Sequence, residues 1–144
     1  MPREYRTNQS SDHEGGSDAT QQARRLLRSF AASSPYIQAC AAVSGDGFII
    51  ASVLSDDVDE DRFGAMCASL LTLSTRAAAE IQRGELRQII LDGELGPMLL
   101  TRAGDLGVLA VATSPEANLG KVMLDTRNTA RALAALDVNQ LYRG

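Results

Sequence analysis

The stretch Val43-Ser-Gly-Asp-Gly-Phe-Ile-Ile-Ala-Ser52 places a Gly-Asp-Gly triplet between two apolar runs. A dinucleotide-binding loop would need a third glycine at position 50 and a helix directly after the loop. Position 50 is Ile, and residues 48–54 are short, apolar and partly β-branched, which predicts a strand. Aspartate and glycine readily adopt the left-handed backbone angles of hairpin turns. The stretch therefore predicts a β-hairpin rather than a nucleotide site.

The segments before and after this hairpin have clear secondary-structure signals. Apolar residues recur at helical spacing from Ser17 until Ser33-Ser34-Pro35, and residues 36–43 then form the first strand of the hairpin. An acidic run, residues 56–61, predicts the capped start of a long helix, because carboxylates stabilise the positive end of the helix dipole. Arg83 and Gly84 predict the end of that helix.

Three further short strands are expected, over residues 85–92, 96–102 and 106–113. The connections between them are too short for parallel crossovers, so neighbouring strands must be antiparallel. Ser114-Pro115-Glu116 predicts the start of the last helix. The expected order is helix, two strands, long helix, three strands, helix.

The long helix has two contrasting faces on an ideal helical wheel. One face is apolar and is expected to lie on the sheet; it holds Phe63, Met66, Cys67, Leu70, Leu73, Ala77, Ala78 and Ile81. The opposite face carries small residues in place of charges: Gly64, Ala65, Ala68, Ser69, Thr72, Thr75 and Ala79. Such a face is either simply solvated or is covered by a second protein surface.

A homodimer is the simplest way to cover the small-residue face, since twofold homodimers dominate among oligomers. The strand that follows, residues 86–91, is apolar on both sides and would be a liability as an open sheet edge. The expected dimer contact combines both elements and consists of Ala65, Ala68, Ser69, Thr72, Thr75, Ala79, Gln88 and Ile90.

Composition and charge limit the functional classes. The chain has 144 residues, is 44% apolar and has a net charge of -4, with no run of lysines and arginines. The length and apolar fraction predict one domain with an aliphatic core over residues 18–138. The acidic net charge argues against binding to nucleic acid. Cys40 and Cys67 lack metal-site or disulfide-framework spacing and are expected to be reduced.

The two ends of the chain are expected to lie outside this domain. Residues 1–17 are polar and nearly free of aliphatic side chains, which predicts a disordered tail, and residues 139–144 form a short C-terminal tail. The N-terminus lacks the apolar core of a secretory signal, and no apolar run is long enough to span a bilayer. A cytoplasmic location without membrane insertion is expected.

The sequence offers little material for catalysis. Its one histidine, His13, lies in the predicted tail, which argues against a histidine-based catalytic group or metal site in the fold. The acidic run lacks the ligand spacing of a calcium loop. Gly120-Lys121 is similar to the end of a phosphate-binding P-loop, which needs glycine at position 115 and Ser or Thr at position 122. This chain has Pro115 and Val122 there, so it has no P-loop at this position. No catalytic residue, cofactor or metal is expected, and the chain is not expected to be an enzyme.

Three motifs in order resemble the Roadblock family, which includes dynein light chains and prokaryotic single-domain proteins. The hairpin Val43–Ser52 is similar to the family's S-x-D-G-x-x-x-A-S pattern. Residues 84–91, Gly-Glu-Leu-Arg-Gln-Ile-Ile-Leu, follow the long helix, and Pro115-Glu-Ala-Asn-Leu-Gly120 is similar to the family's A-N-L-G. The resemblance covers about residues 22–136.

This resemblance implies an α/β fold of the α+β type, profilin-like or longin-like, with a five-stranded antiparallel sheet in the order 2-1-5-4-3. It implies the long helix on one face, the first and last helices on the other, and a homodimer. Family members bind Ras-like small GTPases and some stimulate GTP hydrolysis, so a non-enzymatic regulator or adaptor is expected. Possible partner contacts are Arg62, Arg76 and Arg83. An assembly scaffold without a GTPase and a small-ligand sensor remain alternatives.

Overall fold

The computed structural model describes residues 5–7 and 18–136. Its elements follow the expected order, with one strand added at the start: β1 (Tyr5–Thr7), α1 (Asp18–Ala32), β2 (Ile37–Ser44), β3 (Ile49–Ser55), α2 (Glu60–Glu80), β4 (Gln88–Gly93), β5 (Gly96–Ala103), β6 (Gly107–Thr113) and α3 (Leu119–Ala134). All strand pairs are antiparallel, and the sheet order is β1-β3-β2-β6-β5-β4.

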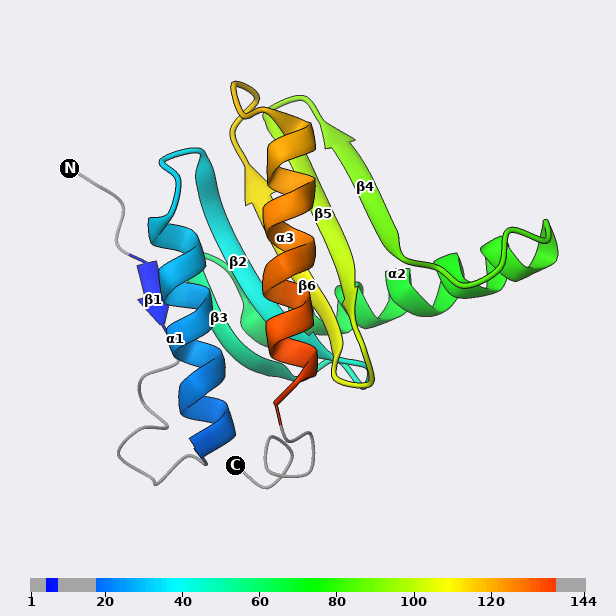
Figure 1. Ribbon diagram of the computed structural model, residues 1–144, viewed down its shortest axis with the longest axis horizontal. Coiled ribbons are helices and arrows are strands. Elements are labelled where there is room, and N and C mark those ends of the chain that lie inside the picture. Colours follow the sequence, from blue (N-terminus) through cyan, green and yellow to red (C-terminus); the bar gives the residue numbers. More distant parts are fainter. Residues whose placement is uncertain (1–4, 8–17, 137–144) are drawn as a thin grey trace.

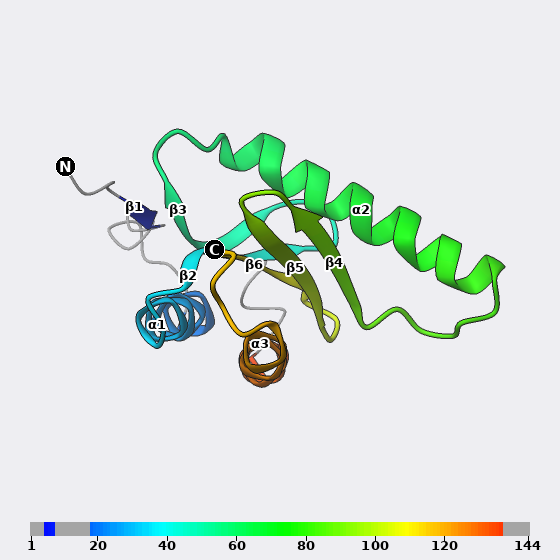
Figure 2. The ribbon, with the colours of Figure 1, turned by 90° about the horizontal axis from the view of Figure 1, so that it is seen from above.

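The predicted topology is confirmed. Without β1, the sheet order β3-β2-β6-β5-β4 is the expected 2-1-5-4-3. The view along the layers shows α2 on one face of the sheet and α1 and α3 on the other (Figure 2). Strands β2 and β6 lie in the middle and are covered on both faces, which explains why nearly every residue of β6 is buried.

The short strand β1 was not expected from the sequence. Tyr5–Thr7 pairs with residues 53–55 of β3 and so covers the outer edge of that strand. These three residues lie within the segment predicted to be a disordered tail. The rest of that segment, residues 1–4 and 8–17, lies outside the described residues. So do residues 137–144, which comprise the last two residues of the predicted domain and the predicted C-terminal tail.

Two apolar clusters fill the space on the two sides of the sheet. Leu27 and Phe30 of α1 and Leu133 of α3 belong to one cluster, together with Leu99 and Leu109 of the sheet. The other lies under α2 and includes Cys67, Leu71, Val43, Leu100 and Val108. Because successive strand residues face opposite sides, β5 and β6 contribute alternately to the two clusters.

The glycine-rich triplet forms the predicted turn. The Gly47 amide donates to the Ser44 carbonyl oxygen at 3.0 Å, and Gly47 has a φ of 93°, which favours glycine. The turn also contacts α2 at Gly64. A Cβ atom built on Gly64 would overlap the carbonyl oxygen of Gly47. Glycine at position 64 therefore lets the first turns of α2 lie directly on the hairpin.

The sheet-facing side of α2 agrees only in part with the predicted one. Phe63, Cys67 and Leu70 of the predicted apolar face pack in the cluster under α2. The buried residues are Gly64, Cys67 and Leu71, whereas Met66, Leu73 and Ile81 of the predicted apolar face are 54%, 64% and 65% exposed. Ala77 is exposed as well, and Gly64 does not belong to the outer face. The helix is rotated about its own axis relative to the prediction, because the close contact between Gly64 and the Gly47 carbonyl sets its orientation. A helical wheel of apolar residues does not record such a contact.

Two predicted helix boundaries were also wrong. Helix α2 ends at Glu80, three residues before Arg83, because Gln82 adopts a φ of 59°. The Arg83 amide donates to the Ala78 carbonyl at 2.8 Å and the Gln82 amide to the Ala79 carbonyl at 3.0 Å, which is the Schellman arrangement. Helix α3 begins after Asn118, whose side chain caps the Lys121 amide at 3.0 Å, rather than at Ser114.

Replacing Gly64 with alanine should destabilise the fold by about 1–3 kcal/mol, because the added methyl group overlaps the Gly47 carbonyl. The matched control is Gly120→Ala in the first turn of α3, where the new Cβ would lie 3.4 Å from Asn118 Oδ1. This control should be neutral or stabilising by up to ~1 kcal/mol. Urea unfolding at one fixed protein concentration measures both. Equal stabilisation by the two substitutions would contradict the close contact.

Burial raises the pKa of the Cys40 thiol to about 12 and that of Cys67 to about 11. Both thiols therefore stay protonated in the folded chain above pH 9, whereas the unfolded chain can ionise them, so stability should fall as pH rises through 9. We expect both cysteines to react slowly with a disulfide reagent at about pH 8 and rapidly in urea. Rapid stoichiometric reaction of the folded protein would show that the thiols are accessible.

Candidate functional site

The outer face of α2 is the first feature that stands out as a candidate interaction surface. Ala65, Ser69, Thr72 and Ala79 are exposed, and Ala68 and Thr75 are partly buried. The Thr75 hydroxyl donates to the Leu71 carbonyl at 2.7 Å, so its polar group is satisfied within the helix. The six helical residues predicted for the dimer contact thus lie on or beside the solvent-facing side of the chain.

Large apolar side chains extend this surface beyond the small residues. Met66, Leu73 and Ile81 are more than half exposed. No residue of α2 after Leu71 is buried, and the C-terminal half of the helix projects away from the sheet (Figure 1). Helix α2 packs on β2, β3 and β6. Its projecting half therefore presents an apolar surface that no other described part of the chain covers.

The edge strand β4 borders this region and, among the described strands, pairs with β5 alone. Ile89 pairs with Leu100 and packs with the cluster under α2, and Leu91 lies on the same face. Gln88 and Ile90 point the other way, since Ile90 is opposite Leu99 of the α1–α3 cluster.

The dimer contact expected at Gln88 and Ile90 stays a prediction. Their side chains lie on the side of the sheet away from α2, not together with the outer face of that helix. The Gln88 Nε2 donates instead to Thr101 Oγ1 at 2.9 Å. Strict alternation along the strand would have assigned Ile89 and Leu91 to the α2 side, once the side covered by α2 was known.

The three arginines proposed as partner contacts are exposed and lie along α2 and its C-terminal end. Arg62 is in the first turn, Arg76 is in the projecting half, and Arg83 follows the helix. The Arg83 Nε donates to the Ile81 carbonyl at 3.1 Å, which holds this side chain close to the end of the helix. Arg76 and Arg83 therefore border the exposed apolar surface of α2.

The acidic segment before α2 serves as a helix cap, as predicted. Asp59 accepts the Arg62 amide at 3.1 Å, and the Ser52 hydroxyl donates to Glu60 Oε1 at 3.3 Å. The Ser55 hydroxyl donates to Asp57. Among the described residues, no group of three or more histidine, cysteine or acidic residues is arranged to hold a metal ion.

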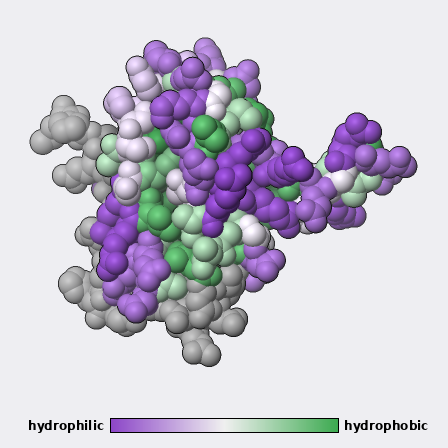
Figure 3. Space-filling view, in the orientation of Figure 1, coloured by the Kyte–Doolittle hydropathy of each residue, from purple (hydrophilic) through white to green (hydrophobic). Residues whose placement is uncertain are grey.

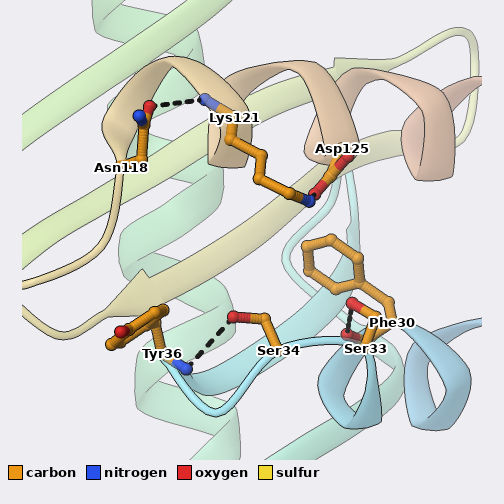
Figure 4. Close-up of polar contacts among 7 residues, drawn as sticks. All are labelled: Phe30, Ser33, Ser34, Tyr36, Asn118, Lys121 and Asp125. Carbon is orange, nitrogen blue, oxygen red and sulfur yellow. Dashed lines mark hydrogen bonds and ion pairs between the residues drawn. The ribbon is translucent and has the colours of Figure 1, made fainter.

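Polar contacts on the opposite face, between α1 and α3, are local and structural (Figure 4). Lys121 forms an ion pair with Asp125 at 2.7 Å on α3, and Ser33 Oγ donates to the Phe30 carbonyl at 2.6 Å at the end of α1. The first contact joins adjacent turns of α3 and the second closes the end of α1. These residues form no nucleophile–base pair of the kind that catalysis needs.

The groove between α1 and α3 has apolar side chains at one end. Leu26 of α1 and Ala132, Ala135 and Leu136 from the end of α3 line it. Hydrophobic surface is visible between the more hydrophilic outer sides of the helices (Figure 3).

His13, the one histidine of the chain, lies outside the described residues. None of the helices in the described parts of the chain has the length and apolar composition that crossing a bilayer requires.

Comparisons with known proteins agree with this architecture. The family model for the Roadblock/LC7 domain matches residues 24–113. The uncharacterized protein MJ1340 of Methanocaldococcus jannaschii is 37% identical over 94 residues, which are 65% of this chain and 82% of that protein. A second protein of the same organism, MJ0714, is 34% identical over the same length.

Solved structures show the same fold at low sequence identity. Myxococcus xanthus MglB superposes with a TM-score of 0.75 at 17% identity, covering 82% of this chain and 89% of MglB. The gliding protein MglB of Thermus thermophilus gives 0.72 at 17% identity, covering 89% and 94%. A Roadblock/LC7 domain from Streptomyces avermitilis gives 0.66 at 18%, covering 76% and 92%. The matched family model, the archaeal relatives and the shared topology together place this chain in the Roadblock/LC7 family.

Proposed function

We propose that the protein is a homodimeric, non-enzymatic adaptor that binds a Ras-like small GTPase and regulates it. The observation that carries this proposal is the uncovered surface formed by the projecting half of α2 and the open edge of β4. Proteins of this family generally act as regulators that carry no catalysis of their own. The proposal assigns the apolar surface of α2 and the β4 edge to a second copy of the chain, and the arginines along α2 to the partner.

Self-association would cover the features that are unfavourable in a single chain. Met66, Leu73 and Ile81 expose apolar area that burial would stabilise by about 25 cal/mol per Å². Strand β4 has unpaired backbone groups along its outer edge, and pairing with a copy of itself would satisfy them. A twofold axis beside β4 would do both at once, because it would place α2 of one copy over the Ile89–Leu91 face of the other.

The GTPase part of the proposal rests on family membership and on the charge pattern of α2. One MglB structure is described as a tetrameric arrangement and another as a gliding protein, so related proteins assemble and take part in motility. Arg62, Arg76 and Arg83 flank the apolar surface and suit an acidic partner. A partner that binds these arginines on the dimer better in one nucleotide state would be shifted toward that state by the difference in affinity.

Two other functions remain as alternatives. A scaffold would use the same surfaces without a GTPase. A sensor of a largely apolar small molecule would need an enclosed pocket, and the pockets lined by the described residues are largely open to solvent. The structure therefore favours a protein that acts through its surface.

Thr72→Glu should convert the dimer to a monomer, because it would introduce a carboxylate at the centre of the proposed contact. Thr72 is exposed in the single chain, so the substitution leaves the fold intact. Ala68→Glu should act in the same direction. The control, Gln22→Glu on exposed α1, adds the same charge elsewhere and should remain dimeric. Light scattering gives the masses, and a dimeric Thr72→Glu protein would refute this contact.

A Ras-like GTPase from the same organism should bind the protein at least ~10-fold more tightly in one nucleotide state, a difference of about 1.4 kcal/mol. Titration calorimetry with GDP-loaded and analogue-loaded GTPase measures this preference, and single-turnover hydrolysis tests for stimulation. Arg76→Glu should weaken binding, whereas Arg25→Glu on α1 should not. Equal affinity for the two nucleotide states would contradict the regulatory role and favour a scaffold. The absence of any binding would refute the GTPase partner.

A further inference from the structure

Four arginines from distant parts of the sequence line one pocket at the end of the sheet near the β5–β6 turn. Arg87 immediately precedes β4, Arg102 is in β5, and Arg127 and Arg131 are in α3. The other lining residues are Glu85, Leu86, Thr101 and Gly104. The lining thus has four cations and one anion in a chain whose net charge is -4.

The backbone holds these arginines as two like-charged pairs. The Arg102 amide donates to the Arg87 carbonyl at 3.0 Å, which continues the β4–β5 ladder and places the two residues opposite each other. Arg127 and Arg131 are four apart on α3 and therefore lie on adjacent turns. Like charges directly opposite on strands, or four apart on a helix, repel each other.

The turn between β5 and β6 keeps the two pairs close together. A Cβ atom built on Gly104 would lie 3.0 Å from the Ala134 Cβ, so glycine at this position allows the turn to approach the last turn of α3. Gly104 also has a φ of 56°, which suits a residue without a side chain. The arginines of α3 are thereby positioned beside the β4–β5 end of the sheet.

The described residues do not neutralise this charge through ion pairs. None of the carboxylates in the described residues lies within ion-pair distance of Arg87, Arg102, Arg127 or Arg131. Arg131 Nη1 donates to Asn128 Oδ1 at 3.3 Å, but an amide carries no charge. Two repelling pairs beside one pocket break a local rule of stable packing, and such departures are expected at functional sites.

We propose that this arginine pocket binds a small phosphoryl-bearing anion of the phosphomonoester or pyrophosphate class. Guanidinium groups match phosphate oxygens with paired hydrogen bonds and stay charged at every physiological pH. A phosphoryl group brings about two negative charges to one point, which offsets this excess of cations better than a single carboxylate. The pocket volume of about 270 Å³ is below the range for drug-sized ligands and suits a small anion.

The proposal does not depend on the GTPase adaptor function. None of the four arginines lies on α2, whose exposed face carries the proposed partner surface. Arg127 and Arg131 lie on α3, which takes no part in the proposed dimer contact, whereas Arg87 directly precedes β4. Neutralising Arg127 and Arg131 should therefore leave the dimer mass and GTPase affinity unchanged. Failure of one proposal does not imply failure of the other.

Titration calorimetry of the full chain with inorganic pyrophosphate at about 50 mM salt is the decisive test. The double variants Arg127→Gln/Arg131→Gln and Arg87→Gln/Arg102→Gln should each lower the affinity at least ~10-fold, because each removes one arginine pair. The matched control, Arg25→Gln/Arg28→Gln, removes two arginines of α1 and should change it less than about 2-fold. Raising the salt to about 200 mM should weaken wild-type binding.

Thermal unfolding supplies a second readout that does not depend on calorimetry. Pyrophosphate should raise the Tm of the wild type and the control, but not that of the two pocket variants. The pocket variants themselves should unfold at the wild-type temperature or higher, since each loses a repulsion. No wild-type binding, or an equal loss in the control, would overturn the proposal.

Two further probes distinguish the source of the phosphoryl group. Phosphatidylcholine vesicles with and without phosphatidic acid test whether the phosphoryl group belongs to a lipid headgroup. Vesicle binding would support a lipid source if it requires both phosphatidic acid and the four arginines and if pyrophosphate displaces it. A glutamate hexapeptide tests an acidic protein segment. Peptide binding that pyrophosphate cannot displace would show a carboxylate surface and overturn the proposal.

Discussion

The contact between α2 and the β2–β3 hairpin is the constraint on which the rest of the structure depends. Gly64 lets the first turns of the helix rest against the Gly47 carbonyl, and Cys67 and Leu71 then follow into the core. This anchoring fixes the rotation of the helix at its N-terminal end. Because α2 is straight and longer than the part of the sheet it covers, its C-terminal half projects past β4 (Figure 1). Both the exposed apolar side chains and the proposed dimer surface result from this geometry.

The two faces of the sheet have different roles. On the α1–α3 side, two helices cover a large apolar cluster, and the polar contacts around them serve the fold (Figure 4). On the α2 side, one helix packs mainly on β3, β2 and β6, and Leu91 of the edge strand β4 stays exposed. An open edge strand beside an exposed apolar helix is unfavourable for an isolated chain. This asymmetry favours a protein that works through contacts with other chains.

The arginine pocket illustrates a different use of the same fold. The sequence shows no cluster of basic residues, and its net charge of -4 argued against binding to a polyanion such as nucleic acid. The pairing of β4 with β5 and the packing of α3 beside the β5–β6 turn bring four arginines to one pocket. Overall charge therefore says little about the local potential at a site built from several elements.

Local sequence determined the hairpin turn, the antiparallel direction of strands joined by short loops and the cap at Asp59, because turn residues, short connections and capping groups act over a few positions. The sequence also carried the family resemblance through three ordered motifs. Only the tertiary structure decided which side of α2 faces the sheet, since the close approach at Gly64 outweighed the apolar stripe of Met66 and Leu73. It likewise decided that Ile89 rather than Ile90 lies on the α2 side, and that Arg87, Arg102, Arg127 and Arg131 meet. These outcomes depend on contacts between residues far apart in the chain, which neither periodicity nor composition records.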